Sequence, residues 1–251
     1  LHNARKARVP MVNLVGDHAL RHQKYDAPLS ADVEGACAPF SDWVRSGRDA
    51  GSFAADAMTA LAVAQSKPGK VATLIAPADI GWDAGGKMAE AVAPAAPAPL
   101  DERALDAAIN ALESGEKTVL LVGSAVLESQ EAMALLHGIA EKTGADILAP
   151  TSNRRMERGQ GRFAINKVPY PINAALECLA PYSRAILIET PPPVAFFAYP
   201  GKPSLLLPVD CHTVTLAAVD ADGSTALAAL ADRIGAKPAT PRDHERPRSE
   251  G

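Results

Sequence analysis

The first apolar run of the chain leads into a polar loop. Residues 9–16 are almost all apolar, and a Gly-Asp-His sequence follows them. A run of this kind is typical of a strand in a parallel sheet that is buried on both faces. The loop over 17–30 is polar and irregular, and we expect a short helix over 32–39 and an extended piece over 40–44 after it. The pattern therefore places the first strand within the first sixteen residues.

A helix and a second strand complete an α/β unit. Apolar positions recur at near-helical spacing over residues 50–65, with Asp49 or Ser52 as the capping residue, and a Lys-Pro-Gly sequence ends the helix. Residues 71–79 form the next apolar run. A connection of this type is a right-handed crossover between two parallel strands.

Residues 83–100 differ from the segments on either side because they are rich in Pro, Gly and Ala. We expect a semi-extended linker there. Strands and helices then alternate, which predicts a second parallel sheet covered by helices on both faces. The expected helices are 101–114, 128–142, 171–179 and 224–234, and the expected strands are 118–123, 145–149, 184–189, 204–209 and 212–216.

The predicted fold class is α/β, with two doubly wound parallel-sheet domains, of which the first is incomplete at its N-terminus. The domains are 1–82, a linker 83–100, a Rossmann-like domain 101–236 and a polar tail 237–251, which we expect to be disordered. The incompleteness is inferred from residues 1–8, which resemble the last turns of a helix, and from Leu1 in the place of an initiating Met.

Composition excludes several classes of function. The formal charge of −4 and a pI near 5.9 argue against a nucleic-acid or membrane-surface partner. No apolar run approaches the roughly 20 residues of a membrane-spanning helix. Cys37, Cys178 and Cys211 lie far apart, which favours buried thiols over a disulfide framework or a zinc site. We therefore expect a cytoplasmic protein without a metal site of its own.

Several segments resemble thiamine-diphosphate-dependent enzymes of the acetolactate synthase type. Residues 3–18, in which Val-Pro-Met-Val leads to a Gly-ended loop, resemble the end of that family's pyrimidine-binding domain. Residues 71–79 resemble its closing strand, whose Pro-x-Asp ending precedes a linker. The linker and residues 118–123 resemble the central domain, and residues 193–203 resemble a branch described as acetolactate synthase large-subunit-like. The resemblance covers about residues 3–235.

The resemblance implies a carboligase or decarboxylase of 2-keto acids such as pyruvate, with a role in branched-chain amino-acid biosynthesis. In this family thiamine diphosphate is the electron sink, a glutamate of the pyrimidine-binding domain activates it, and a Gly-Asp-Gly domain holds Mg²⁺ and the diphosphate. The chain contains no Gly-Asp-Gly sequence, and the glutamate would lie before Leu1. We therefore expect a fragment that is inactive alone. The family's active sites lie between subunits, which implies a homodimer or homotetramer.

The candidate site residues follow the expected strands. His18 follows the first strand and is a candidate cleft residue, able to orient substrate or relay a proton; alternatively, His18 and Asp17 only cap the next turn. His22 is a weaker candidate for the same cleft. The turn at Gly123 and Ser124 is a candidate for a phosphate of FAD, which the acetolactate synthases carry in this domain, or an ordinary tight turn.

Further candidates lie in a loop with four arginines around two glycines, residues 153–163. Arg154 and Arg155 are suited to clamping a phosphate or carboxylate, although such a loop is more often solvated or a subunit contact. Glu189 and Asp210 are suited to accepting ribose hydroxyls of a bound nucleotide, or they cap the next element. These residues also fit an alternative function, a non-catalytic FAD- or ADP-binding or subunit-assembly module.

One aromatic segment completes the set of candidates. Phe196, Phe197 and Tyr199 precede a Pro-Gly turn. They are suited to a substrate lid, or to a hydrophobic plug that packs the loop onto the sheet or a neighbouring subunit.

Overall fold

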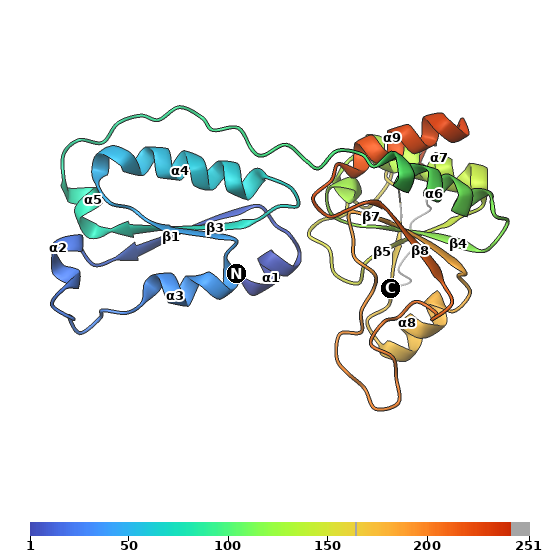
Figure 1. Cartoon of the computed structure of the whole chain (residues 1–251), viewed down its shortest axis with the longest axis horizontal. Coiled ribbons are helices and arrows are strands. Elements are labelled where there is room, and N and C mark those ends of the chain that lie inside the picture. The colour runs from blue at the N-terminus through green and yellow to red at the C-terminus, as the bar shows by residue number, and fades with distance from the viewer. Residues whose placement is uncertain (164, 242–251) are drawn as a thin grey trace, which may run out of the picture. The chain divides into compact units, whose positions relative to one another are not determined.

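The computed structural model describes residues 1–163 and 165–241. The chain divides into two compact units, Leu1–Pro97 and Ala98–Gly251 (Figure 1). Each unit is built on a sheet of parallel strands, three in the first and five in the second. The predicted class, two α/β domains with parallel sheets, is therefore confirmed.

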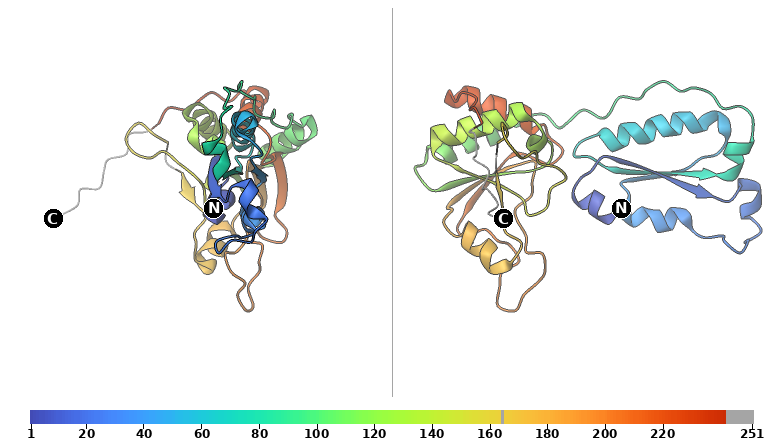
Figure 2. Two further views of the ribbon diagram at one scale, coloured as in Figure 1. Left: turned by 90° about the vertical axis from the view of Figure 1, so that its left-hand side faces the viewer. Right: turned by 180° about the vertical axis from the view of Figure 1, so that it is seen from behind.

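The first unit is organised around β3 (Val71–Pro77), with the strand order β1-β3-β2. β1 is Met11–Asp17 and β2 is Trp43–Ser46. Helix α4 (Ala50–Gln65) covers one face of this sheet, and the short helix α3 (Val33–Cys37) lies on the other (Figures 1 and 2). β3 is the central strand, and almost all of its residues are buried because it has neighbours on both edges and both faces.

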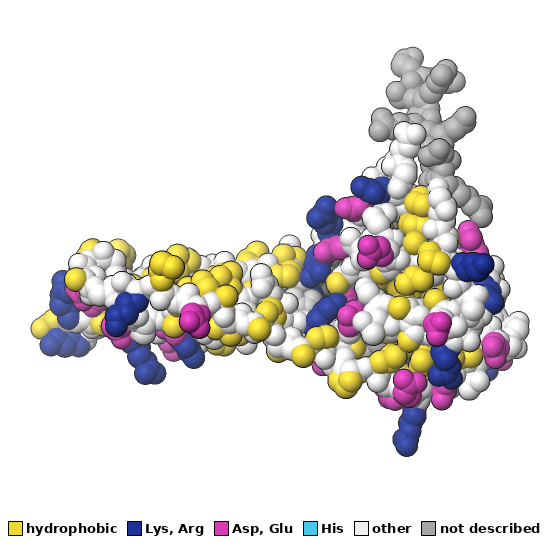
Figure 3. Space-filling model, turned by 90° about the horizontal axis from the view of Figure 1, so that it is seen from above, with side chains coloured by type: hydrophobic (Ala, Val, Ile, Leu, Met, Phe, Trp, Pro, Cys, Tyr) yellow, Lys and Arg dark blue, Asp and Glu magenta, His cyan; other side chains and the backbone are white. Residues whose placement is uncertain are grey.

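Helix α4 begins where the sequence predicts it to begin. The Asp49 carboxylate accepts a hydrogen bond from the Ser52 backbone N–H at 2.8 Å, which caps the helix. Ala60 and Ala64 pack against Leu74 of β3. Because alanine side chains are small, the helix lies close to the sheet with a thin core between them. Hydrophobic side chains are also frequent on the outer face of the unit around this helix (Figure 3).

The prediction that the first strand is buried on both faces is wrong for β1. It is an edge strand that pairs, among the described strands, with β3 alone. Its exposure alternates along the strand: Val12 is 38% and Leu14 64% exposed, while Asn13 and Val15 are half-buried. An apolar run reveals that a strand belongs to a sheet, but it does not reveal whether a neighbouring element covers both rows of its side chains.

Short elements lie in the segments that the sequence treats as irregular. The structure places β2 over 43–46, slightly after the expected extended piece, because a 3₁₀ helix occupies Ala38–Phe40. The remaining short helices of the first unit are α1 (His2–Lys6), α2 (Leu20–Gln23) and α5 (Ala78–Trp82). Of these, α2 and α5 were not expected from the sequence.

The second unit has the strand order β6-β5-β4-β7-β8. The strands are β4 (Thr118–Val122), β5 (Asp146–Ala149), β6 (Asn166–Lys167), β7 (Arg184–Ile188) and β8 (His212–Ala217). Helices α6 (Glu102–Glu113), α7 (Gln130–Thr143) and α9 (Gly223–Ile234) pack on one face, and α8 (Ile172–Leu179) packs on the other (Figure 1). The strand order reverses between β4 and β7, and the carboxyl ends of these two strands form the switch point of the sheet.

Residues 204–209, expected as a strand, do not form one. Only an isolated bridge joins Leu205 to Val194, within an irregular excursion that connects β7 to β8 (Figure 1). Pro203 precedes this segment and Pro208 lies within it, and proline has no backbone N–H to donate to a neighbouring strand. The apolar side chains that suggested a strand serve packing instead, since Leu206 is buried beside α8.

The helix expected over 128–142 forms as α7, which begins two residues later than predicted, and a short helix that was not expected precedes it. A 3₁₀ helix, η2 (Ser124–Glu128), follows β4, and α7 starts after it with Ser129 as its capping residue. Gly144 ends α7 with a φ of 73°, as its position in the sequence predicts. The surface that α6, α7 and α9 present carries interspersed charges of both signs (Figure 3).

The segment expected as a disordered tail falls partly outside the described residues, which end at 241. Within the described part, the Ala239 backbone N–H donates to the Ala134 carbonyl of α7 at 2.9 Å. The expected linker is without helix or strand over 83–97, and Ala98 bridges to Ala221 of the second unit.

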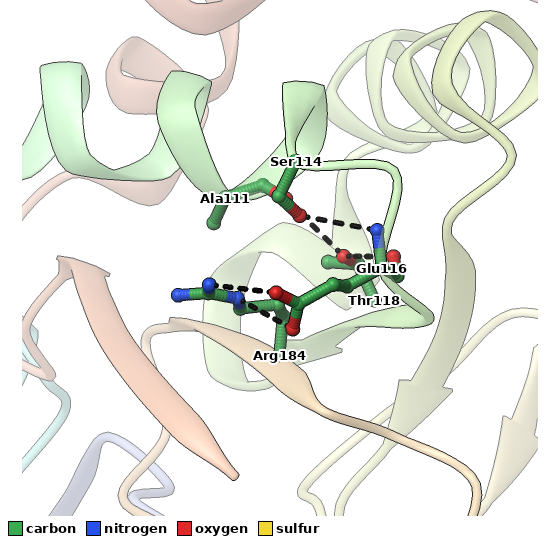
Figure 4. Close-up of polar contacts among 5 residues, drawn as sticks. All are labelled: Ala111, Ser114, Glu116, Thr118 and Arg184. Carbon is green, nitrogen blue, oxygen red and sulfur yellow. Dashed lines mark hydrogen bonds and ion pairs between the residues drawn. The ribbon is translucent and has the colours of Figure 1, made fainter.

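An ion pair between Glu116 and Arg184 links the turn before β4 to the start of β7, at the amino-terminal edge of the second sheet (Figure 4). The Arg184 guanidinium donates two hydrogen bonds to the Glu116 carboxylate, at 3.0 and 2.9 Å. The Ser114 hydroxyl accepts from the Glu116 backbone N–H at 3.2 Å, so the turn before β4 holds its carboxylate in place. The hydrogen bonds from Arg184 hold the pKa of Glu116 below its usual range.

Candidate functional site

A cavity of about 770 Å³ lies at the carboxyl edge of the first sheet. It is formed by the end of β1, by the loop and helix that follow it, and by α5, which begins directly after β3. Because parallel strands end at the same edge, this is where open α/β sheets place ligands. Its lining includes Gly16, His18, Arg21, His22, Leu29 and Trp82.

The sequence left open whether Asp17 and His18 line a cleft or only cap the next turn, and in the structure Asp17 caps the turn while His18 lines the cavity. The Asp17 carboxylate accepts hydrogen bonds from the His18 backbone N–H at 2.7 Å and from Gln23 Nε2 at 3.0 Å, so it fixes the turn into α2. The His18 side chain instead lines the cavity. Its ring centroid lies 5.5 Å from that of His22, which lines the same cavity. The two imidazoles thus lie together beside it.

Arg21 and Trp82 belong to this cavity but were not singled out from the sequence. The Arg21 guanidinium lies 5.2 Å from the centroid of the Trp82 ring, a cation–π contact between α2 and α5. Trp82 is 65% and Leu29 83% exposed, which is unusual for such large apolar side chains. A cation, two imidazoles and apolar surface suit an organic anion with an apolar body. The available sequence signal was a tryptophan three residues after the predicted strand over 71–79.

The described residues offer no evident place for a metal ion in this unit or the other. Across residues 1–163 and 165–241, no group of three or more His, Cys, Asp or Glu side chains is arranged to hold one. The three cysteines are free thiols and are half-buried rather than buried. Burial raises the pKa of the Cys178 and Cys211 thiols, which disfavours the thiolate form.

In the second unit, Gly123 lies at the switch point of the sheet. Its backbone N–H donates to the Ile188 carbonyl at 2.9 Å. A Cβ at this position would lie 2.9 Å from the Glu189 carbonyl oxygen and 3.2 Å from Thr190 Cβ. Glycine is therefore required by the close approach of the segment that leaves β7. The side chain of Ser124, the other candidate of this turn, lies outside the described residues.

The carboxylate of Glu189 points into the protein. Glu189 is 0% exposed, and its Oε2 atom accepts hydrogen bonds from the backbone N–H groups of Ala125 at 2.7 Å and Val126 at 3.4 Å. Its Oε1 atom accepts from the Gly223 N–H at 3.0 Å. The structure thus gives this carboxylate backbone partners at the starts of η2 and α9, where the sequence suggested the hydroxyls of a ribose.

The arginines of the loop over 153–163 bond mainly to the loop's own surroundings. Arg154, whose side chain is 14% exposed, pairs with Glu128 through two hydrogen bonds of 2.5 and 3.1 Å. The other partners are Glu157 for Arg155 and Arg162, and the Ile165 carbonyl for Arg158. The loop follows β5 and so shares the carboxyl edge with Gly123, as expected, but its charges are largely compensated.

Asp210 lies at the opposite edge of the sheet from Gly123. It was expected at the end of a strand, but it precedes β8, which starts at His212 and runs parallel to β7. Asp210 therefore belongs to the amino edge, and the expectation that it shares an edge with Glu189 is wrong. The reason is that residues 204–209 form no strand.

The aromatic candidates form an exposed row in the excursion between β7 and β8. Phe196 contacts Tyr170 and Phe197, with ring centroids 4.9 and 4.8 Å apart, and Phe197 contacts Tyr199 at 6.5 Å. Phe196 is 61% and Phe197 57% exposed. The rings pack on one another at the surface.

Comparisons with known proteins bear on the class of this chain. No family model matches it. It is 41% identical over 235 residues to a Mycobacterium tuberculosis protein described as "Putative acetolactate synthase large subunit IlvX", a match that covers 93% of this chain and 44% of that protein.

None of the described helices is both long and apolar enough to cross a bilayer.

Two solved structures share the fold at 20% identity. One is described as a "putative thiamin diphosphate-dependent enzyme" from Mycobacterium smegmatis, with a TM-score of 0.73 over 98% of this chain and 50% of that one. The other is the Rhodococcus jostii RHA1 thiamine diphosphate-dependent 4-hydroxybenzoylformate decarboxylase, with a TM-score of 0.74 over 100% of this chain and 51% of that one.

The chain therefore has the fold of thiamine-diphosphate-dependent enzymes. Its sequence is similar to that of a protein described as a putative acetolactate synthase large subunit, which confirms the resemblance found in the sequence. The chain spans about half the length of the relatives it matches, 44% of the Mycobacterium tuberculosis protein and 50–51% of the solved ones.

Proposed function

We propose that this chain supplies two of the α/β domains of a thiamine-diphosphate-dependent enzyme that condenses or decarboxylates 2-keto acids. Residues 1–82 act as the C-terminal part of the pyrimidine-binding domain, and residues 101–236 as the central domain. The observation that carries the proposal is the cavity at the carboxyl edge of the first sheet, in a chain with 41% identity to an acetolactate synthase large-subunit-type protein.

The cavity has the groups that a 2-keto acid needs for binding. The Arg21 guanidinium can pair with the carboxylate of the substrate, as guanidinium groups commonly do. The His18 and His22 imidazoles can donate a hydrogen bond to the keto oxygen or move a proton. Trp82 and Leu29 provide apolar surface for the rest of the substrate. His18 and Arg21 are thus assigned to substrate binding.

Thiamine diphosphate, when bound, supplies the electron sink for cleaving or forming the bond next to the keto carbon. The residues of this chain do not fit its diphosphate and Mg²⁺: the sequence lacks Gly-Asp-Gly, and the described residues contain no cluster of metal ligands. We infer that other polypeptide segments supply that part of the active site and that the chain alone is inactive. The complete enzyme is proposed to be a cytoplasmic homodimer or homotetramer.

Two measurements on the purified chain test these assignments. With thiamine diphosphate, Mg²⁺ and pyruvate, we expect no acetolactate and no CO₂ above the protein-free rate; measurable product overturns the inference of inactivity. In NMR titrations with pyruvate and benzoylformate, we expect chemical-shift changes around the cavity.

A His18→Ala variant should weaken that response, whereas a matched control, His212→Ala at the exposed start of β8, should leave it unchanged. If both variants respond to the keto acids as the unaltered chain does, His18 has no part in binding.

The exposed aromatic row favours a second role, in subunit assembly. Phe196 and Phe197 expose more than half of their surface in a protein whose aromatic content is only 4%. Large exposed aromatic side chains are enriched in interfaces. We expect a double substitution of both residues by Ser to lower the association state in analytical ultracentrifugation; an unchanged sedimentation profile would rule this role out.

A further inference from the structure

Glu189 has an unusual backbone conformation for its residue type. Its φ is 52°, in the left-handed region that side chains other than glycine enter only at a cost. It also buries a carboxylate completely, which is unfavourable unless hydrogen bonds compensate it. Two unfavourable features at one residue indicate that its side chain satisfies a specific requirement of its surroundings.

The surroundings of this carboxylate are those of an anion site. The switch point between β4 and β7 is where open α/β sheets bind nucleotides, and their phosphates bond to backbone N–H groups at the starts of helices. Here the N–H groups of Ala125 and Val126 open η2, and that of Gly223 opens α9. All three donate to Glu189, at 2.7, 3.4 and 3.0 Å.

The space around Glu189 is shaped to its side chain. A Cβ at Gly223 would lie 2.9 Å from Glu189 Cγ and 2.7 Å from Val126 Cγ2. A Cβ at Gly123 would lie 2.9 Å from the Glu189 carbonyl oxygen. Both glycines therefore contact Glu189, and a side chain at either position would collide with it. The gap that a diphosphate would need is filled by protein atoms.

We propose that the Glu189 carboxylate is a built-in anion that occupies the phosphate position of this sheet, so that the second unit binds neither FAD nor another nucleotide diphosphate at its switch point. The negative charge of the glutamate takes the place of the negative charge of a phosphate. Its hydrogen bonds link the end of β7 to the starts of η2 and α9. The FAD suggested by the resemblance to acetolactate synthases does not fit these residues.

A variant that removes the carboxylate without disturbing the backbone provides the test. Glu189→Gly suits the left-handed conformation and leaves three N–H donors facing an empty space. We expect its melting temperature to fall below that of the unaltered chain. Added sodium formate should then raise it by several degrees more than sodium chloride of equal ionic strength does, because formate can replace the missing carboxylate.

The unaltered chain should gain nothing specific from formate, because its site is filled. Glu116→Ala, which removes a carboxylate from an exposed ion pair at the amino edge, is the matched control and should show no formate-specific gain. If Glu189→Gly folds and responds to formate no more than Glu116→Ala does, the proposal is wrong.

A second variant keeps the proposal testable if Glu189→Gly does not fold. Glu189→Gln retains the shape of the side chain but loses the charge. We expect the amides of Ala125 and Gly223 to exchange with solvent at least tenfold faster in this variant, while the Gly123 amide, bonded to Ile188, keeps its protection. Unchanged exchange at both amides overturns the proposal.

Nucleotide binding is measured directly on the unaltered chain. Titration with FAD, followed by flavin fluorescence, and with ADP, followed by calorimetry, should give no binding. Stoichiometric binding of either nucleotide, with chemical-shift changes at Gly123 and Gly223, would refute the proposal. These outcomes are independent of whether the first unit binds 2-keto acids.

Discussion

Leu14 and Leu74 are register partners on neighbouring parallel strands, yet Leu14 is 64% exposed and Leu74 only 1%. Both side chains point to the side of the sheet that α4 covers. Leu74 lies on the central strand under the alanines of the helix, whereas Leu14 lies on the edge strand beyond them. The difference therefore comes from the position of each strand in the sheet and from the reach of one helix.

This pair gives a matched prediction about stability. Leu74→Ala removes buried methyl groups and leaves a cavity, so it should lower the free energy of unfolding of the first unit by about 2–5 kcal/mol. Leu14→Ala makes the same chemical change at the partner position and should cost no more than about 0.5 kcal/mol. Urea denaturation of both variants tests this. Equal losses would show that Leu14 is buried in solution by something that covers β1.

A second prediction concerns the cavity of the first unit. Arg21→Ala should weaken the binding of pyruvate or benzoylformate by at least about tenfold, because a guanidinium–carboxylate pair contributes about 1.5–3 kcal/mol. Arg48→Ala, which removes an exposed arginine of the same unit, is the control and should have no effect. NMR titration provides both dissociation constants. Equal weakening in the two variants would indicate a general electrostatic effect and not a contact with Arg21.

The ion pair between Glu116 and Arg184 predicts a pH dependence of stability. Because Arg184 lowers the pKa of Glu116 in the folded chain, the pair stabilises the fold at pH values above the ordinary glutamate pKa of 4.5. That contribution is lost as the pH falls through the lowered pKa. Glu116→Gln should therefore be less stable than the unaltered chain at pH 7 and equally stable near pH 2. A stability difference that does not change with pH would contradict this.

A fourth prediction concerns the start of α9. The Asp222 carboxylate accepts hydrogen bonds from the backbone N–H groups of Ser224 at 3.0 Å and Thr225 at 3.3 Å. Asp222→Ala should lower the free energy of unfolding of the second unit by about 1 kcal/mol, and Asp222→Asn should restore most of that loss. Thermal unfolding measures both. If the asparagine variant is as unstable as the alanine variant, the contribution of Asp222 does not depend on capping.

Local patterns in the sequence predicted elements that depend on local chemistry. The cap at Asp49, the helix stop at Gly144 and the strands over 118–122 and 184–188 follow from residue types and spacing alone. Residues 204–209 were predicted wrongly because their apolar side chains serve packing beside α8 without a partner strand. The short helices α2 and α5 were missed because each is barely longer than one turn.

The candidate site shows the same division. His18 was singled out because it follows a strand at the edge where parallel sheets bind ligands. Arg21 and Trp82 could not be joined to it from the sequence, since they lie 61 positions apart and meet only through the pairing of β1 with β3. Glu189 was recognised at a strand end, but its partners on η2 and α9 lie 64, 63 and 34 positions away.

The sequence by itself determined the class of fold, the two units and the relationship to thiamine-diphosphate-dependent enzymes, because periodicity, caps and family motifs are local properties of a chain. The tertiary structure alone decided which strands are central, which arginines are compensated, and that a carboxylate fills the switch point of the second sheet. Burial and hydrogen-bond partnership depend on which distant segments meet, and that is settled only when the sheets assemble.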